Sequence, residues 1–257
     1  MSDSLILSLE GNVATIRLNN PPANTWTLES LNHLEGLVQD LNDNPAVTAL
    51  VIYSEQERFF SAGADLKLFA DVSPEEARPM AEAFGKAFEA LTEFKGISIA
   101  AINGFALGGG LEVALACDLR VAEKQALLGL PEAAVGLLPC AGGTQNLMWL
   151  VGEAWTKRMI LLGEKVDAET AARIGLVEEV VEQGQSFSKA SELAQKVTGQ
   201  SPDSVVACKK LIQMNRVAGR DKNAAERELF LELFKGENQN EGVKAFLEKR
   251  SPDWHYD

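Results

Sequence analysis

Residues Ile97–Glu112 read Ile-Ser-Ile-Ala-Ala-Ile-Asn-Gly-Phe-Ala-Leu-Gly-Gly-Gly-Leu-Glu. The apolar run Ile97–Ile102 predicts a buried strand. The glycines Gly108–Gly110 follow, at a cost in conformational entropy, and good helix formers come directly after them. A strand, a glycine turn and a helix start bring bare N–H groups and the positive end of a helix dipole to one place. With Glu112 in the first turn, this stretch predicts a site that holds a developing anion beside an acid or base.

The segments on either side of this stretch alternate between strand and helix patterns. Residues 5–18 contain two apolar–polar alternations around Gly11-Asn12, which predict a β-hairpin. Val47–Tyr53 is apolar almost throughout and predicts a strand that is covered on both faces. Toward the C-terminus only helical patterns remain. We therefore predict an α/β fold with a core of residues 1–189 and a C-terminal helical region of residues 190–257.

Composition limits the classes of partner. The chain has 257 residues and a formal net charge of −13, which repels nucleic acid and anionic membrane surfaces. No apolar run approaches the ~20 residues that span a bilayer, and residues 1–5 lack the basic start of a signal peptide. We therefore expect a cytoplasmic protein that binds neither nucleic acid nor membrane. Cys117 and Cys208 stand in apolar helical patterns, and we expect both thiols to be reduced and buried.

Two glutamates stand in loops that are rich in small and apolar residues. Glu112 follows the three glycines, and Glu132 lies near the start of a second glycine-containing segment, residues 131–144. Carboxylates in apolar, water-poor surroundings tend to have a raised pKa, which suits general acid–base chemistry near neutral pH. The residues alone leave an alternative open. In it, Glu112 only complements the helix dipole and Glu132 is a solvated residue at a helix start.

Three strings of sequence resemble a known family. They are Phe60-Ser-Ala-Gly-Ala-Asp-Leu-Lys67, Asn103-Gly-Phe-Ala-Leu-Gly-Gly-Gly-Leu-Glu112 and Pro131-Glu-Ala-Ala-Val-Gly-Leu-Leu-Pro-Cys-Ala-Gly-Gly-Thr-Gln145. In this order they closely resemble the crotonase superfamily, and within it they look most like enoyl-CoA hydratase. The similarity runs from the first hairpin to residues 241–250. It implies a spiral of repeated β-β-α units and C-terminal helices that assemble the chain as a homotrimer or a dimer of trimers.

The resemblance also implies a chemistry. The substrate would be an acyl-CoA thioester, whose carbonyl oxygen accepts hydrogen bonds from the backbone N–H groups of Ala64 and Gly109. Glu112 and Glu132 match positions at which hydratases of the family carry glutamates. Together they would add water across the 2,3-double bond of a 2-trans-enoyl-CoA. Coenzyme A is part of that substrate, so we expect no separate cofactor and no metal.

The CoA moiety leaves a weaker pattern in the sequence. The resemblance implies that the backbone of residues 62–67 lines its path, and that Phe246 and Lys249 approach it from a neighbouring subunit. Asp65 has the alternative of a helix cap or turn residue. Solvation is the alternative for Lys67 and Lys249, and helix packing is the alternative for Phe246. The residues predicted to contact substrate are Ala62, Ala64, Asp65, Leu66, Lys67, Gly109, Phe246 and Lys249.

Two other functions remain as alternatives. One is another crotonase reaction on an acyl-CoA, such as double-bond isomerisation, in which Glu132 alone would do the proton work. The other is a non-catalytic acyl-CoA-binding paralogue. The presence of both glutamates favours hydration. Thr25-Trp26 departs from the small residues or leucine that are common here in the family, which leaves the acyl preference open. The aromatic side chains expected in the core rather than in an acyl pocket are Trp26, Phe69, Phe84 and Trp149.

Overall fold

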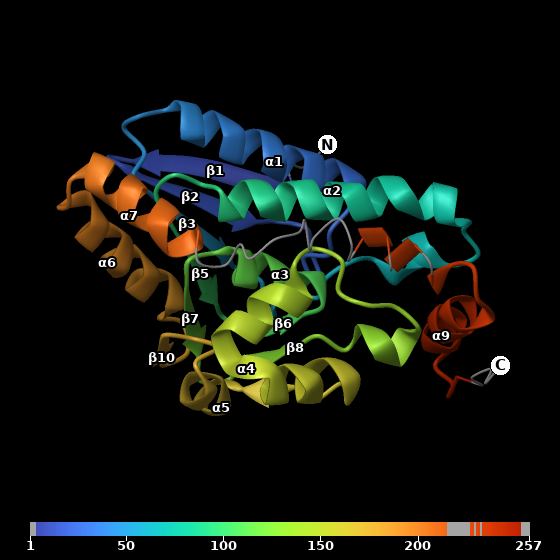
Figure 1. The fold of residues 1–257 in the computed structure, drawn as a ribbon. Helices are drawn as coiled ribbons and strands as arrows, with labels where there is room; N and C mark the ends of the chain where they lie inside the picture. Colours follow the sequence, from blue (N-terminus) through green and yellow to red (C-terminus); the bar gives the residue numbers. More distant parts are fainter. Residues whose placement is uncertain (1–3, 215–226, 229, 232, 253–257) are drawn as a thin grey trace.

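Two β-sheets form the frame of the fold (Figure 1). The computed structural model describes residues 4–214, 227–228, 230–231 and 233–252. The larger sheet has the strand order β1-β2-β3-β5-β7-β10, and the smaller has the order β4-β6-β8-β9. The strands of the larger sheet are β1 (Leu5–Glu10), β2 (Val13–Leu18), β3 (Ala49–Ser54), β5 (Ile97–Ile102), β7 (Leu119–Glu123) and β10 (Glu179–Val181). Those of the smaller sheet are β4 (Phe59–Ser61), β6 (Phe105–Leu107), β8 (Leu127–Gly129) and β9 (Val166–Asp167).

The chain builds both sheets at once by repeating a β-β-α unit. Strand β3 belongs to the larger sheet and β4 to the smaller one, and helix α2 (Pro74–Thr92) follows them. The same order recurs as β5, β6 and α3 (Gly109–Ala116), and again as β7, β8 and α4 (Gly143–Leu161). Because equivalent strands pair in parallel, each unit advances one strand along both sheets. The predicted α/β spiral is confirmed.

Alternating side chains of the larger sheet pack into two separate cores. On β3, Leu50 and Ile52 belong to the main core, which also contains the inner faces of α1 (Leu28–Asp43) and α2. Val51 points the other way, into a smaller core under α6 (Ser186–Thr198). Helix α1 begins after Thr27 because the Thr27 hydroxyl accepts from the Ser30 N–H, and the Ser30 hydroxyl accepts from the Thr27 N–H.

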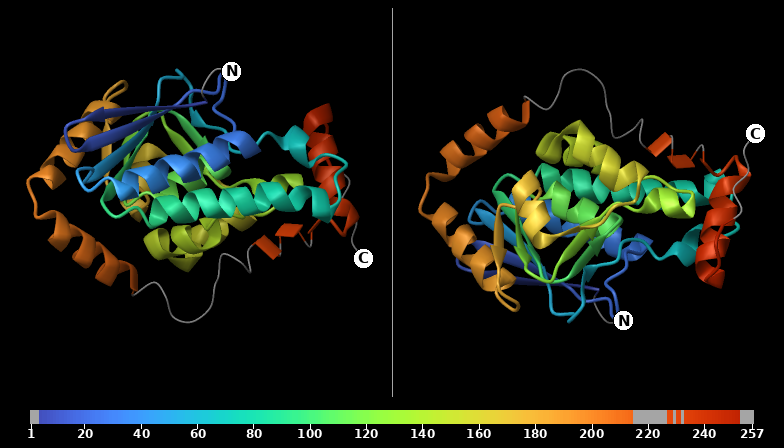
Figure 2. Two further views of the ribbon diagram at one scale, coloured as in Figure 1. Left: turned by 90° about the horizontal axis from the view of Figure 1, so that it is seen from above. Right: turned by 90° about the horizontal axis from the view of Figure 1, so that it is seen from below.

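The helices that follow the spiral lie at opposite ends of the molecule. Both views of Figure 2 show α6 and α7 (Pro202–Met214) at one end and α9 (Glu237–Glu248) at the other. Helix α7 is fastened by the buried Lys209, whose ammonium group donates to the carbonyls of Phe94 at 2.6 Å and Gly96 at 2.9 Å. The same ammonium group donates to the Asp118 carboxylate at 2.6 Å. The predicted boundary between residues 189 and 190 falls inside α6, which packs against the larger sheet.

Two side chains differ from the sequence expectation. Cys208 is exposed on α7 rather than buried, whereas Cys117 is buried as predicted. Trp149 is 39% exposed on α4 rather than in the core. In both cases a helical pattern indicates which residues share a face, but not whether another element covers that face. Among the described residues, no helix combines the length and apolar character that crossing a membrane requires.

Candidate active site

One cavity of about 530 Å³ brings together the three segments that carry the predicted chemistry. The loop after β4 supplies one wall, the start of α3 supplies a second, and the short 3₁₀ helix η2 (Glu132–Val135) supplies a third. Helix α9 closes a further side with Phe246 and Leu247. The predicted residues that line this cavity are Ala62, Ala64, Asp65, Leu66, Lys67, Gly109, Glu112, Glu132 and Phe246.

Two backbone N–H groups come together where the loop after β4 meets the start of α3. Trp26 fixes this loop. Its backbone N–H donates to the Gly63 carbonyl at 2.8 Å, and the residue forms a β-bridge with Ala64. Gly63 lies against α3: a Cβ atom there would be 3.0 Å from the Gly109 nitrogen and 2.8 Å from the Leu107 carbonyl oxygen. Only glycine permits this approach. Among the described residues, no acceptor takes a hydrogen bond from the N–H of Ala64 or Gly109, so both donors are available to a ligand.

Helix α3 carries Glu112 into the interior wall of the cavity. The helix begins after Gly108, whose φ of 54° suits glycine, and the Glu112 N–H closes the first turn on the Gly108 carbonyl at 2.9 Å. All eight residues of α3 are buried, and Glu112 is 3% exposed. Its Oε1 accepts hydrogen bonds from the N–H groups of Ala141 at 2.8 Å and Gly143 at 3.1 Å. Charge-assisted hydrogen bonds of this kind hold a carboxylate in one orientation.

Glu132 reaches the same space from a short turn. It follows Pro131 as the first residue of η2, and none of the η2 residues is buried as a whole. Its carboxylate is nevertheless turned inward, because both carboxylate oxygens are shielded from solvent. A Cβ atom on Gly108 would be 3.3 Å from Glu132 Oε1, so this carboxylate lies over the glycine that precedes α3. The two glutamates therefore line one cavity from two separate segments of the chain.

Helix α9 supports the turn that carries Glu132. Gly242 of α9 lies against η2, because a Cβ atom there would be 2.5 Å from the carbonyl carbon of Val135. Gly136, just after η2, lies against α9 in the same way, with its would-be Cβ 2.5 Å from the Asn238 carbonyl oxygen. Two glycines thus let one backbone lie directly on another. The position of Glu132 depends on a helix that comes much later in the sequence.

Helix α9 also contacts the wall that follows β4. The buried amide of Gln239 donates to the Phe69 carbonyl at 2.8 Å, at the end of the 3₁₀ helix η1 (Leu66–Phe69). Asp65 caps the start of η1 by accepting a hydrogen bond from the Lys67 N–H at 3.1 Å. This is the helix-cap alternative stated for Asp65, although the residue also lines the cavity. Helix α9 therefore contacts both loops that flank α3 in the cavity.

A buried arginine holds the opposite end of α3. Arg120 of β7 is 1% exposed, and its guanidinium donates to the carbonyls of Ala114 at 3.3 Å and Cys117 at 2.9 Å. It also pairs with Glu178 at 2.5 Å. A cation at a helix C-terminus complements the dipole and satisfies carbonyls that lack an intrahelical partner. Burial raises the pKa of the neighbouring Cys117 thiol to about 12, so this thiol is neutral at physiological pH.

Of the two C-terminal residues predicted to contact CoA, one lines the cavity and the other does not. Phe246 is 57% exposed and lines the cavity of its own chain. Lys249 caps α9 in a left-handed conformation and is not among the described residues that line this cavity. Contact of either side chain with a neighbouring subunit remains a prediction.

Several cavity residues carry no signal in the sequence. Phe84 is buried as expected of a core residue, yet it also lines the cavity. Its place on α2 follows the same helical periodicity as its core neighbours, so the pattern does not separate the two roles. Lys165 lines the cavity next to Gly129, in a segment without any motif. Thr25 lines it too, and here the unusual Thr25-Trp26 pair was the available signal.

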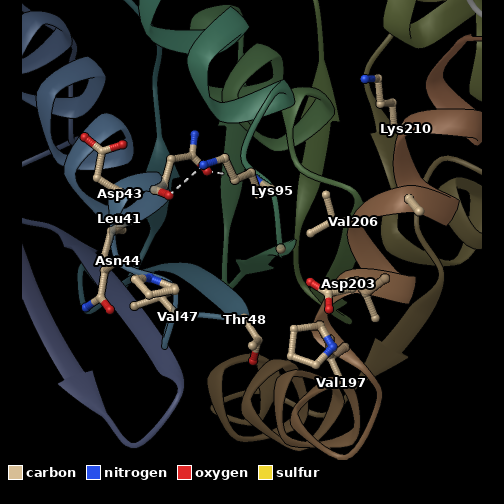
Figure 3. Close-up of a pocket in the computed structure, with 16 residues that line it drawn as sticks. Leu41, Asp43, Asn44, Val47, Thr48, Lys95, Val197, Asp203, Val206 and Lys210 are labelled. Atoms are coloured by element: carbon tan, nitrogen blue, oxygen red, sulfur yellow. Dashed lines mark hydrogen bonds between the residues drawn. The ribbon is translucent and has the colours of Figure 1, made fainter.

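A larger cavity of about 690 Å³ lies between the end of α1 and the start of α7 (Figure 3). On one side, the backbone N–H of Lys95 donates to the Asn42 side chain at 2.8 Å, and its ammonium group donates to the Asn42 carbonyl at 3.0 Å. Among the described residues, none that lines this larger cavity comes from the three segments that carry the predicted chemistry. The charged side chains there are Asp43, Lys95, Asp203 and Lys210. The candidate active site is therefore the smaller cavity.

Comparisons with known proteins agree with this geometry. A family model described as enoyl-CoA hydratase/isomerase matches residues 8–257. A short-chain-enoyl-CoA hydratase from Clostridium acetobutylicum is 36% identical over 250 residues, which cover 96% of each chain. Among solved structures, Pseudomonas aeruginosa DspI is 56% identical, with a TM-score of 0.83 and coverage of 91% of this chain and 96% of that chain. A carnitinyl-CoA hydratase from Mycobacterium avium is 32% identical, with a TM-score of 0.86 and 99% coverage of both chains.

Proposed function

We infer the reaction from the family to which this chain belongs, the enoyl-CoA hydratase/isomerase family of the crotonase superfamily. The enzyme is an enoyl-CoA hydratase, which adds water across the 2,3-double bond of a 2-trans-enoyl-CoA to give a 3-hydroxyacyl-CoA. One structural observation supports this reaction above the others in the family: two glutamates and two available N–H donors line a single cavity. Double-bond isomerisation would need only one of the glutamates.

The N–H groups of Ala64 and Gly109 bind the thioester oxygen in this proposal. Negative charge develops on that oxygen when water attacks the β-carbon, because the α-carbon electrons delocalise into an enolate. Donors that are already oriented stabilise this charge without reorganising, and losing one such donor costs about 3 kcal/mol in other enzymes. The N-terminal end of α3 adds the positive end of its dipole at the same place.

Glu112 and Glu132 hold the attacking water and move its protons. The N–H groups of Ala141 and Gly143 orient the Glu112 carboxylate, which takes a proton from the water as the hydroxyl oxygen bonds to the β-carbon. Glu132, which lies over Gly108, delivers a proton to the α-carbon. Glu112 gains the proton that the water loses, and Glu132, protonated at the start, loses the proton that the α-carbon gains. Transfer of one proton from Glu112 back to Glu132 restores the enzyme, so the net reaction is addition of water without any change in redox state.

The CoA moiety follows the wall formed by residues 62–67. Lys67 and Lys165 are the cations among the described residues that line the cavity, and both attract the phosphates of CoA. Apolar side chains such as Phe84 and Leu137 provide a dry surface for the acyl chain. Coenzyme A enters as part of the substrate, and this scheme uses no metal and no separate cofactor.

We further propose that the chain assembles as a homotrimer or a dimer of trimers in the cytoplasm. Val206, Leu211 and Ile212 of α7 expose apolar side chains that a monomer would leave in water. The three cysteines form no disulfide, which suits a reducing compartment. Size-exclusion chromatography with light scattering separates a trimer or hexamer from a monomer, and a monomer would contradict the assembly.

The direct test of the function measures loss of enoyl absorbance when the protein is added to a series of 2-trans-enoyl-CoA esters. The product should have the mass of the substrate plus one water. No change with any ester of the series would contradict hydration. Migration of the double bond without gain of water would assign isomerisation, and tight binding without any product would assign the non-catalytic function.

A further inference from the structure

Three buried aromatic rings form a row between the two segments that carry the N–H donors. Phe84 and Phe88 lie four residues apart on α2, so they share one face of this helix. The ring centroids of Trp26 and Phe88 are 5.6 Å apart with an interplanar angle of 72°. Those of Phe88 and Phe84 are also 5.6 Å apart, at 81°. Both contacts are edge-to-face, and each of the three residues is at most 2% exposed.

Each end of this aromatic row contacts one donor segment. At one end, the Trp26 backbone holds the Gly63 carbonyl and pairs with Ala64. At the other end, Phe84 lies against Gly109, because a Cβ atom on Gly109 would be 2.7 Å from Phe84 Cε1. The row therefore runs from the segment that bears one donor to the residue that bears the other.

We propose that Trp26 and Phe88 are positioning residues that set the relative placement of the Ala64 and Gly109 N–H groups. This inference rests on the proposed hydratase function. Neither Trp26 nor Phe88 lines the cavity, so both act through the backbone of the donor segments rather than on the substrate. Edge-to-face contacts are directional, and packed interiors do not deform continuously. Removing the middle ring lets the two donor segments shift independently.

The surroundings of the Trp26 indole indicate that this side chain does more than fill the core. Its Nε1 is buried and has no hydrogen-bond partner among the described residues. A buried N–H without an acceptor lowers the stability of a fold, so an apolar ring would be the better choice for stability alone. Trp26 therefore carries a cost that a phenyl ring would not. What it contributes is a large, flat surface for the edge-to-face contact with Phe88.

The test compares Phe88→Leu with Phe94→Leu, because both replace a phenyl ring that is 1% exposed. Phe94 lies just after α2, near the Lys209 ammonium group and outside the aromatic row. With the wild-type enzyme, the absorption band of bound dimethylaminocinnamoyl-CoA should shift to the red, because the two donors polarise its carbonyl. Phe88→Leu should reduce this shift and lower kcat for crotonyl-CoA about tenfold, with KM nearly unchanged. Phe94→Leu should lose stability while it keeps the band shift and kcat.

A second pair of variants decides the question independently if Phe88→Leu does not fold. Trp26→Phe keeps a ring and should keep most of the band shift and kcat, whereas Trp26→Leu should lose both. A folded Phe88→Leu with the wild-type shift and kcat would overturn the inference, and so would equal losses in Phe94→Leu. A wild-type enzyme that neither hydrates enoyl-CoA nor shifts the band would instead contradict the proposed function.

Discussion

Glu112 and Glu132 line the same cavity, but the molecule holds them by different means. Glu112 stands on a helix whose residues are all buried, and two backbone N–H groups hold its Oε1. Glu132 stands on a 3₁₀ turn without a fully buried residue, and this turn lies against α9 at one end of the molecule (Figure 2). One carboxylate is fixed by the core of the spiral, and the other is fixed by a contact between distant segments.

This difference predicts different responses to mutation. A change near Glu112 acts inside a packed interior that has little room to adjust. A change at the contact between α9 and η2 acts on a helix at one end of the molecule with four buried residues, and we expect this helix to move outward more easily. If both glutamates are needed for hydration, substitutions at the surface should alter the geometry of the Glu132 wall more readily than that of the Glu112 wall. The variants below test this contrast in order of expected effect.

The largest effect should come from Glu112→Gln and Glu132→Gln, because each removes one acid–base group and keeps its shape. Hydration of crotonyl-CoA should slow by about 10²- to 10⁴-fold in each variant. Binding of a saturated acyl-CoA, measured by calorimetry, should be nearly unchanged. Full activity of Glu112→Gln together with an inactive Glu132→Gln would indicate isomerase-type chemistry. It would also show that the reaction does not use Glu112.

The next largest effect should come from Gly143→Ala on the Glu112 wall. The new Cβ atom would be 2.8 Å from Glu112 Oε1 and 2.9 Å from the Pro139 Cβ, so the Glu112 carboxylate must move. A displacement near 1 Å costs about 100-fold in rate, and we expect a loss of kcat of that order. Gly36→Ala is the control, because a Cβ atom there meets nothing within 4 Å. An unchanged kcat in Gly143→Ala would show that the Glu112 wall can adjust like a surface segment.

A smaller effect should come from Gly242→Ala on the Glu132 wall. Its Cβ atom would be 2.5 Å from the carbonyl carbon of Val135, and we expect α9 to relieve the contact by moving outward. We expect kcat to fall about tenfold with little change in Tm. Gly236→Ala, at the N-cap of the same helix, has its nearest neighbour at 3.8 Å and should leave kcat unchanged. A loss in Gly242→Ala as large as that in Gly143→Ala would contradict the contrast between the two walls.

The smallest effect should come from Glu123→Gln, which changes a buried glutamate outside the cavity. Burial acts to raise the pKa of Glu123, but hydrogen bonds from Gly184, Ser186 and Gln125 outweigh it and hold the pKa below its usual value of 4.5. The ionised carboxylate therefore stabilises the fold above pH 4.5, and this contribution is lost as the pH falls through the lowered pKa.

Thermal unfolding as a function of pH checks this prediction. Below about pH 4.5, the Tm of the wild type should fall more steeply than that of Glu123→Gln. Activity near neutral pH should be the same for both proteins. A loss of hydratase activity in Glu123→Gln would mean that a buried glutamate need not line the cavity to affect the reaction.

Much of the fold was predictable because its close backbone approaches leave marks in the sequence. Where α3 begins, Gly63, Gly109 and Gly110 stand where a Cβ atom would collide with a neighbour. The strings that contain Gly63 and Gly109 are also two of those that resemble the family. The structure shows that the predicted donors and both glutamates line one cavity. Their catalytic roles remain predictions until the variants above are measured.

The rest was not predictable, because it depends on contacts between segments far apart in the chain. Gly242 lies on Val135, yet nothing in the sequence of either segment indicates a contact with the other. The pattern of α2 does not distinguish Phe84, which lines the cavity, from helix neighbours that only fill the core. Exposure of Cys208 depends on what covers α7, which periodicity does not report.

The glycines packed around the start of α3 and beside Glu112 also limit how the enzyme can diversify. A Cβ atom at any of these positions would come within 3.0 Å of a neighbouring atom, and the positions are Gly63, Gly109, Gly110 and Gly143. Natural or laboratory evolution toward other acyl groups must therefore use cavity side chains such as Thr25, Leu137 and Leu138. A library that randomises these three and leaves the glycines intact would vary the substrate while conserving the reaction.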